Sequence, residues 1–203
     1  MAEVRKRIEA QPQGEVFASR SMLALGSRAA IDQSLTRLAR EGTILRVARG
    51  AYVRPKESRF VGKVIPEPQE TVKAMAQARG ETLLVHGAEA VLRFGLTTQV
   101  PVRSLFYTSG PSRKLRVGKQ EVILRHASLR LLALGSGAAA MAFSALWYMG
   151  KRQVTMATLA RIQEKLSPAE FCELRKSAQL PGWLSDLFHD FEKAGPNRSR
   201  SKM

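Results

Sequence analysis

The pattern of apolar and polar residues changes period several times along the chain, and each change predicts a boundary between elements. Apolar residues at spacings of three and four predict helices, whereas alternation at a period of two predicts strands. The pattern predicts helices at residues 4–10, 19–25, 28–41, 69–79, 88–94, 138–149, 155–166, 169–178 and 183–193. It predicts strands at residues 15–17, 43–47, 51–53, 83–85, 104–108, 115–117 and 121–126.

This order of elements predicts an α+β protein with two domains. A helix, a short helix, a longer helix and a hairpin over residues 1–56 are typical of a winged helix-turn-helix. A linker is expected at residues 57–68, which are polar and contain two prolines. Residues 69–194 predict a mixed domain with a small sheet and a helical C-terminal part. Residues 195–203 are polar and basic and predict a disordered tail.

The longer helix of the first domain has two distinct faces. Ile31, Leu35 and Leu38 lie at i, i+4 and i+7, so they form an apolar face suited to burial. The opposite face carries side chains that can read bases, because Arg pairs with guanine, Gln pairs with adenine, and Thr contacts a thymine methyl or a phosphate. These candidate residues are Arg28, Gln33, Thr36, Arg37 and Arg40. An ordinary solvated surface helix has the same two faces, so this helix alone does not decide the function.

The predicted hairpin after this helix is strongly basic. Arg46 and Arg49 lie on it, Arg54 follows it, and no acidic residue occurs between Thr43 and Lys56. A hairpin of this composition beside a helix suits contacts with DNA phosphates or with the minor groove. Helix and hairpin together therefore favour double-stranded DNA as the ligand.

The charge of the whole chain agrees with a polyanionic partner. Its 33 Lys and Arg residues against 17 Asp and Glu residues give a net charge of +16. Nucleic acid is the first expectation, although an acidic protein or an anionic membrane surface would meet the same charge. A second basic set can extend the DNA footprint or receive an acidic partner, and a solvated strand face explains it equally well. This set is Arg113, Lys114, Arg116, Lys119 and Arg125.

The sequence has no signature of catalysis or of metal binding. His86, His126 and His189 are far apart and lack ligand spacing to acids or cysteine. The turn at residues 109–114 lacks the Gly-Lys-Ser/Thr ending of a phosphate-binding loop. Cys172 is the single cysteine, which excludes an internal disulfide. We therefore expect no enzymatic activity, no cofactor and no metal. The absence of a signal peptide and of a long apolar run predicts a cytoplasmic protein without membrane contact.

Two stretches resemble a known group of bacterial proteins. AIDQSLTRLAREGTILRVARGAYVRP (residues 30–55) resembles the N-terminal winged helix of AbiEi-type antitoxins, the regulator half of type IV toxin–antitoxin pairs, and a related family of uncharacterised bacterial proteins. HGAEAVLRFGLTTQVPVRSLFYTSGPSRKLRVGKQEVILRHA (residues 86–127) is similar to the second region of that group. There a GL-(S/T)-TQ-P element precedes a strand, a T-G-x-x-R turn and a further strand. The resemblance covers residues 14–127.

The resemblance implies a regulator that represses its own promoter by binding repeats within it. It also implies a partner, a nucleotidyltransferase-like toxin that the C-terminal domain opposes. We therefore expect a sequence-specific, double-stranded-DNA-binding transcriptional regulator that acts as autorepressor and antitoxin. Two alternatives stay open. One is an antitoxin that neutralises an acidic toxin by direct contact, without DNA as its main ligand. The other is a winged-helix protein that binds RNA.

Overall fold

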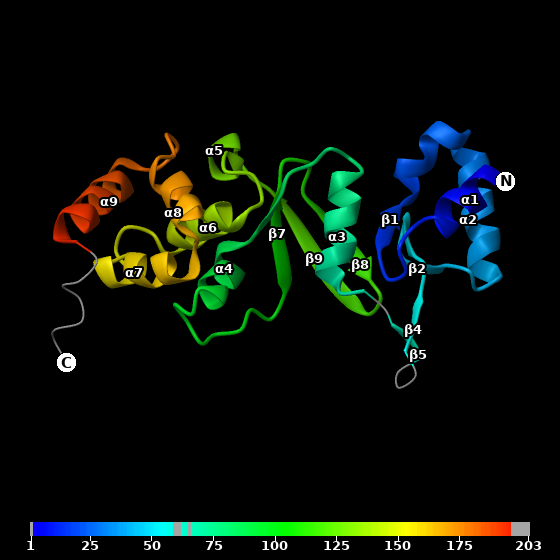
Figure 1. Ribbon diagram of the computed structural model, residues 1–203, viewed down its shortest axis with the longest axis horizontal. Helices are drawn as coiled ribbons and strands as arrows, with labels where there is room; N and C mark the ends of the chain where they lie inside the picture. Colours follow the sequence, from blue (N-terminus) through cyan, green and yellow to red (C-terminus); the bar gives the residue numbers. More distant parts are fainter. Residues whose placement is uncertain (1, 59–61, 65, 196–203) are drawn as a thin grey trace. The chain divides into compact units, whose positions relative to one another are not determined.

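Figure 1 shows the chain as a computed structural model that describes residues 2–58, 62–64 and 66–195. Its helices and short β-sheets confirm the predicted α+β class. The chain forms two compact units. The first unit contains the residues up to Glu81 together with Lys114–Val122, and the second contains Thr82–Arg113 and the residues from Ile123 onward.

The first unit begins with three helices and a three-stranded sheet, in the predicted order. These elements are α1 (Ala2–Glu9), β1 (Val16–Ala18), the 3₁₀-helix η1 (Ser19–Leu25), α2 (Arg28–Arg40), β2 (Leu45–Ala48) and β3 (Ala51–Val53). The sheet has the strand order β1-β3-β2, and β3 runs antiparallel to both neighbours. Phe17 of β1 lies opposite Tyr52 of β3, and their rings stack with centroids 6.1 Å apart.

Apolar side chains from these elements form one core. The predicted apolar face of α2 is confirmed, because Ile31, Leu35 and Leu38 are buried. They belong to the same cluster as Ile8 of α1 and Met22 of η1. This packing fixes the rotation of α2 about its own axis, and therefore which of its side chains remain exposed.

Two stretches predicted to lack regular structure have different outcomes. Residues 57–68, predicted as a linker, contain most of a strand pair in which β4 (Lys56–Ser58) lies antiparallel to β5 (Gly62–Val64). The sequences of the two strands, KES and GKV, show no hydrophobic alternation, and for this reason the pattern predicts no strand there. The predicted tail at residues 195–203 lies, apart from Gly195, outside the described residues.

The first unit extends beyond the predicted domain boundary. The helix α3 (Pro68–Gln77) belongs to it, although the sequence places this helix in the second domain. The physical reason is packing, since α3 contacts β1 and β3 and buries Val72, Met75 and Ala76. The hairpin tip Lys114–Val122 also belongs to the first unit.

All four strands predicted after α3 are confirmed. They are β6 (Leu83–Val85), β7 (Ser104–Thr108), β8 (Arg113–Val117) and β9 (Gln120–His126). They form one sheet with the order β6-β7-β9-β8. β6 runs antiparallel to β7, with Leu84 opposite Tyr107. Gly118, in the turn between β8 and β9, has a positive φ of 58°, which favours glycine.

The remaining helices form the core of the second unit. They are α4 (Gly87–Arg93), α5 (Leu129–Leu132), α6 (Ala138–Met149), α7 (Met156–Lys165), α8 (Pro168–Arg175) and α9 (Gly182–Ala194). The central helix is α6, which contacts α4, α5, α8 and β6. It buries Phe143 and Leu146 with four alanines, as a helix enclosed on most sides does. No helix in the described part of the chain is long and apolar enough to cross a membrane.

Candidate nucleic-acid interface

The five residues predicted to contact bases all lie exposed on α2. The helix begins at Ser27, whose Oγ accepts a hydrogen bond of 3.3 Å from the backbone N–H of Ala30. This cap fixes the start of the helix, and the core contacts fix its rotation. Gln33 and Arg40 make no side-chain hydrogen bond to another described residue, so both side chains are available to a ligand.

Two of the predicted arginines form ion pairs along α2. Arg28 Nε lies 2.9 Å from Asp32 Oδ2, and Arg37 Nε lies 3.0 Å from Glu41 Oε1. Hydrogen bonds from Arg5 and then from Arg37 hold the pKa of the Glu41 carboxyl below its usual value. Exposed pairs of this kind contribute little to stability. They do orient the guanidinium groups, and 65% of the Arg37 side chain remains exposed.

The hydroxyl of Thr36 has a contact within the helix. Its Oγ1 donates a 2.7 Å hydrogen bond to the carbonyl of Asp32, one turn earlier. This bond uses the hydroxyl proton and fixes the side chain, while the residue itself stays exposed. The Thr36 methyl group and the lone pairs of Oγ1 are what remains for a ligand.

The hairpin of β2 and β3 is held against the start of η1. The N–H of Ser19 donates a 2.8 Å hydrogen bond to the carbonyl of Gly50, in the turn of the hairpin. Gly50 has a φ of +79°, a conformation that favours glycine. Arg46 on β2 and Arg49 in the turn are exposed. Neither has an acidic partner among the described residues, so the hairpin offers two uncompensated positive charges.

Arg54 has a different environment from the other predicted DNA contacts. Its Nη1 donates to the carbonyl of Glu9 at 2.7 Å and to the carbonyl of Gln11 at 3.3 Å. The last carbonyls of a helix lack partners within the helix, and here a charged donor satisfies that of Glu9, the last residue of α1. Arg54 therefore ties the end of α1 and the residues after it to the end of β3. Sequence reasoning missed this contact because it joins residues 43 and 45 positions apart.

The second predicted basic set is divided between the two units. Lys114, Arg116 and Lys119 belong to the first unit and are exposed, and Lys114 Nζ lies 3.6 Å from Glu121 Oε1. Arg113 and Arg125 belong to the second unit. The five residues therefore belong to two separate parts of the fold.

His86 forms a small aromatic cluster in the second unit. Its Nδ1 accepts a 3.3 Å hydrogen bond from the N–H of Ala88 and so caps α4. Its ring centroid lies 4.7 Å from that of Tyr107 and 5.5 Å from that of Tyr148. Burial, with a smaller effect from the charge of Arg125, lowers the pKa of His86. In the described part of the chain, no group of three or more His, Cys, Asp and Glu side chains is placed to hold a metal ion.

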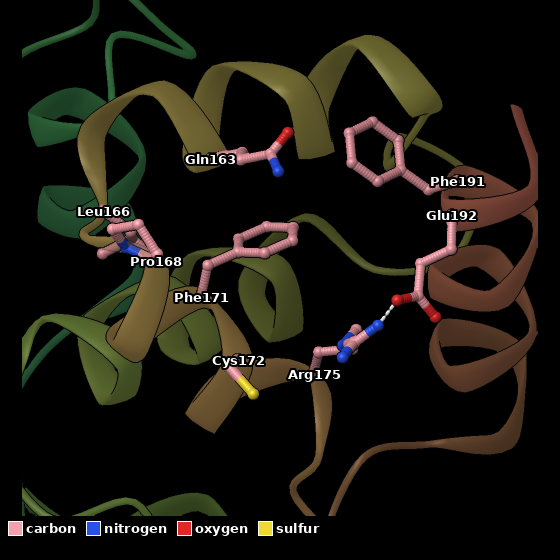
Figure 2. A pocket seen from close by; sticks show the side chains of 8 residues that line it. All are labelled: Gln163, Leu166, Pro168, Phe171, Cys172, Arg175, Phe191 and Glu192. Atoms are coloured by element: carbon pink, nitrogen blue, oxygen red, sulfur yellow. Dashed lines mark ion pairs between the residues drawn. The ribbon is translucent and has the colours of Figure 1, made fainter. Parts of the chain in front are cut away.

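A cavity of about 410 Å³ lies among α7, α8 and α9 of the second unit (Figure 2). Its lining consists of Gln163, Leu166, Pro168, Phe171, Cys172, Arg175, Phe191 and Glu192. Figure 2 shows Arg175 and Glu192 pointing toward each other as an ion pair. A hydrogen bond from Lys176 holds the pKa of the Cys172 thiol below its usual value. Most of the lining is apolar, so the cavity mainly offers packing surface.

A second cavity, of about 380 Å³, lies within the first unit and is basic. Four arginines line it, namely Arg20, Arg28, Arg49 and Arg79. The sequence singled out Arg28 and Arg49 but not the other two. Arg20 lies in η1, before α2, and Arg79 follows α3. No periodic pattern in the sequence therefore connects these two residues with Arg28 and Arg49. Only the fold brings the four side chains around one cavity.

The profile of one protein family matches most of the chain. It is described as a family of unknown function, DUF6088, and it matches residues 3–173. No curated protein matches the sequence significantly. The family match includes all of the candidate DNA-facing residues on α2 and on the hairpin and the whole lining of the basic cavity, but it ends before Arg175, Phe191 and Glu192 of the other cavity. Because the match covers well over half of the chain, this protein belongs to the DUF6088 family of unknown function.

Proposed function

We propose that residues 1–56 form a winged helix-turn-helix that binds double-stranded DNA with a preference for sequence. The order α1, η1, α2 and then the β2–β3 hairpin supports this proposal, as does the three-stranded sheet with β3 in its centre. In such a fold α2 is the helix that enters the major groove, and the hairpin is the wing.

The observation that carries the proposal is the composition of the side chains that α2 and the hairpin expose. α2 presents Gln33, Arg37 and Arg40 on the side opposite its buried face. The hairpin adds the uncompensated charges of Arg46 and Arg49. Helix side chains of these types pair with base edges, while arginines on a hairpin contact the phosphate backbone. The side chains proposed to pair with bases and those proposed to contact phosphates therefore come from segments that are consecutive in the sequence.

The biological role proposed for this DNA binding is autorepression within a toxin–antitoxin-like operon. Its support is the resemblance of residues 14–127 to AbiEi-type antitoxins, in which the regulator binds repeats of its own promoter. The second unit would then contact a nucleotidyltransferase-like toxin. A gene for such a toxin beside the gene for this chain, and co-purification of the two proteins, would support this role.

The proposal is tested by titrating the full chain into fluorescently labelled duplexes at fixed salt. The probes are the DNA upstream of its own gene, a scrambled duplex of equal length and composition, and an RNA duplex. We expect the upstream DNA to bind roughly 10³-fold more tightly than the scrambled DNA, as specific regulators do. Equal affinity for both DNA duplexes would contradict sequence-specific recognition, and tighter binding of the RNA would favour the RNA-binding alternative.

A further inference from the structure

The basic cavity of the first unit gathers positive charge from four separate elements. Arg20 lies in η1, Arg28 begins α2, Arg49 lies in the hairpin turn, and Arg79 follows α3. The described lining contains no acidic side chain. Apart from the arginines it consists of three small residues, Ala18, Ser19 and Gly50, together with Met75 and Leu115. We call this site the arginine cavity.

The charges in the arginine cavity are only partly balanced by ion pairs. Arg28 pairs with Asp32 at 2.9 Å, and Arg79 Nη1 lies 3.9 Å from Glu81 Oε1. Arg20 and Arg49 have no acidic partner among the described residues. Arginine stays protonated at any physiological pH, so the four guanidinium groups repel one another across the cavity.

The position of Arg28 in the arginine cavity does not contribute to the stability of α2. The first turn of a helix favours acidic residues, because the helix dipole places partial positive charge there. The first turn of α2 has no acidic residue and carries Arg28 instead. An anion in the cavity would be attracted both by the arginines and by the exposed start of α2.

The walls of the arginine cavity are held by backbone contacts. Ser19, beside Arg20, is buried, and its N–H donates to the carbonyl of Gly50, beside Arg49. A Cβ added at Gly50 would lie 3.4 Å from Ser19 Oγ, so the turn approaches η1 closely. The backbone at Arg20 and Arg49 is therefore fixed on the two sides of the cavity before any ligand binds, while their exposed side chains only have to choose a rotamer.

We infer that the arginine cavity is a binding site for a phosphate group. Guanidinium groups form paired, charge-assisted hydrogen bonds with phosphate oxygens, and several of them around one cavity match a multiply charged anion. The phosphate can belong to the DNA backbone beside α2 or to a free polyphosphate. The inference rests on the geometry of the cavity and is independent of whether α2 reads bases.

The test measures binding of inorganic pyrophosphate to the full chain by titration calorimetry at low ionic strength. Arg20→Ala and Arg79→Ala are the informative variants, because neither residue belongs to the proposed base-reading set. We expect each to weaken pyrophosphate binding about tenfold or more, as loss of a charge-assisted hydrogen bond does. Lys73→Ala is the matched control, since Lys73 is an exposed cation on α3 outside the cavity lining. It should bind within about twofold of the unaltered chain.

A thermal melt without pyrophosphate separates a binding role from a structural role. If the arginines serve a ligand, Arg20→Ala leaves the Tm unchanged or raises it, because one of four repelling charges is removed. The variant should then lose the rise in Tm that pyrophosphate gives the unaltered chain. A lower Tm in Arg20→Ala together with unaltered pyrophosphate binding would overturn the inference. An equal loss of binding in Lys73→Ala would also overturn it, since that result indicates diffuse attraction.

A competition with a labelled DNA duplex identifies the source of the phosphate. Displacement of the duplex by pyrophosphate, with weaker duplex binding in both variants, supports a backbone phosphate in the cavity. Unchanged duplex binding in variants that have lost pyrophosphate supports a free phosphate ligand. If no duplex binds at all, the proposed DNA function fails, while the loss of pyrophosphate binding in the variants still supports the cavity as a phosphate site.

Discussion

At the scale of single residues, arginines of similar appearance in the sequence have different physical roles. Arg37 lies exposed on α2, with one ion pair along the helix. Arg49 lies exposed in the hairpin turn without an acidic partner among the described residues. Arg54 instead donates to two backbone carbonyls near the end of α1. These environments separate a base-reading role, a phosphate-anchoring role and a structural role, and each of these roles predicts a different mutant phenotype.

Arg54→Ala should destabilise the protein and leave DNA contacts intact. The substitution removes charged hydrogen bonds to the carbonyls of Glu9 and Gln11; a bond of this kind contributes about 1.5–3 kcal/mol when buried, and less here because the first is exposed and the second is 3.3 Å long. We expect a loss of about 1–2 kcal/mol in the free energy of unfolding, measured by urea denaturation. Arg46→Ala is the control, since the exposed Arg46 side chain has no hydrogen bond to lose. Unchanged stability combined with weaker DNA binding would instead make Arg54 a DNA contact.

Arg37→Ala should reduce base preference and leave stability nearly unchanged. An arginine paired with guanine contributes about 1–3 kcal/mol of discrimination, whereas its exposed pair with Glu41 contributes less than about 1 kcal/mol. Anisotropy titrations with the upstream and scrambled duplexes should therefore show a smaller ratio of affinities. Lys6→Ala, which removes an exposed cation from α1, should keep the ratio of the unaltered chain. A preserved ratio in Arg37→Ala would exclude Arg37 from base reading.

His86 is expected to make the stability of the second unit dependent on pH. Burial lowers its pKa in the folded protein, so the unfolded chain binds the proton more readily. The contribution of neutral His86 is complete above the unfolded pKa of about 6.5 and decreases as the pH falls below it. Denaturation at pH 5.5 and at pH 7.5 should show lower stability at the acidic value. His86→Asn keeps an acceptor for the N–H of Ala88 and should lower this difference, whereas an unchanged difference would assign it to other groups.

At the scale of elements, patterns among residues close in sequence predicted the helices and strands, whereas they did not indicate the contacts between elements distant in sequence. The helix predicted at residues 169–178 corresponds to α8, which begins at a capping box of Ser167 and Glu170, and such a cap depends on residues only three apart. The apolar stripe of α2 likewise fixed its exposed face. By contrast, α3 joins the first unit through contacts with β1, some fifty residues earlier, and no local pattern indicates them. Arg20 and Arg79 are absent from the predicted DNA-binding residues for the same reason, since only contacts between distant elements bring them near Arg28 and Arg49.

The close approach of α4 and α6 gives a prediction about a single methyl group. A Cβ at Gly87 would lie 2.1 Å from Tyr148 Cβ and 2.7 Å from the carbonyl oxygen of Ser144. Gly87→Ala must therefore push the two helices apart, at a cost of about 3 kcal/mol or more. Gly182→Ala is the control, because a Cβ there meets no atom within 4 Å, and it should be neutral or slightly stabilising. Chemical denaturation of both variants measures the difference, and equal stability would show that α4 and α6 can separate freely.

At the scale of the whole molecule, the net charge of +16 determines how DNA binding responds to salt. Binding to a duplex releases counterions, so the logarithm of the affinity falls linearly with the logarithm of the salt concentration, by about 0.9 for each phosphate neutralised. Arg49→Ala removes one anchoring charge and should reduce this slope by about 1, with weaker binding to upstream and scrambled duplexes alike. Gln33→Ala removes no charge, so it should keep the slope and weaken only the upstream duplex. If Arg49→Ala keeps the full slope, Arg49 does not contact a phosphate, and the attraction of the duplex comes from the overall charge of the chain rather than from the hairpin.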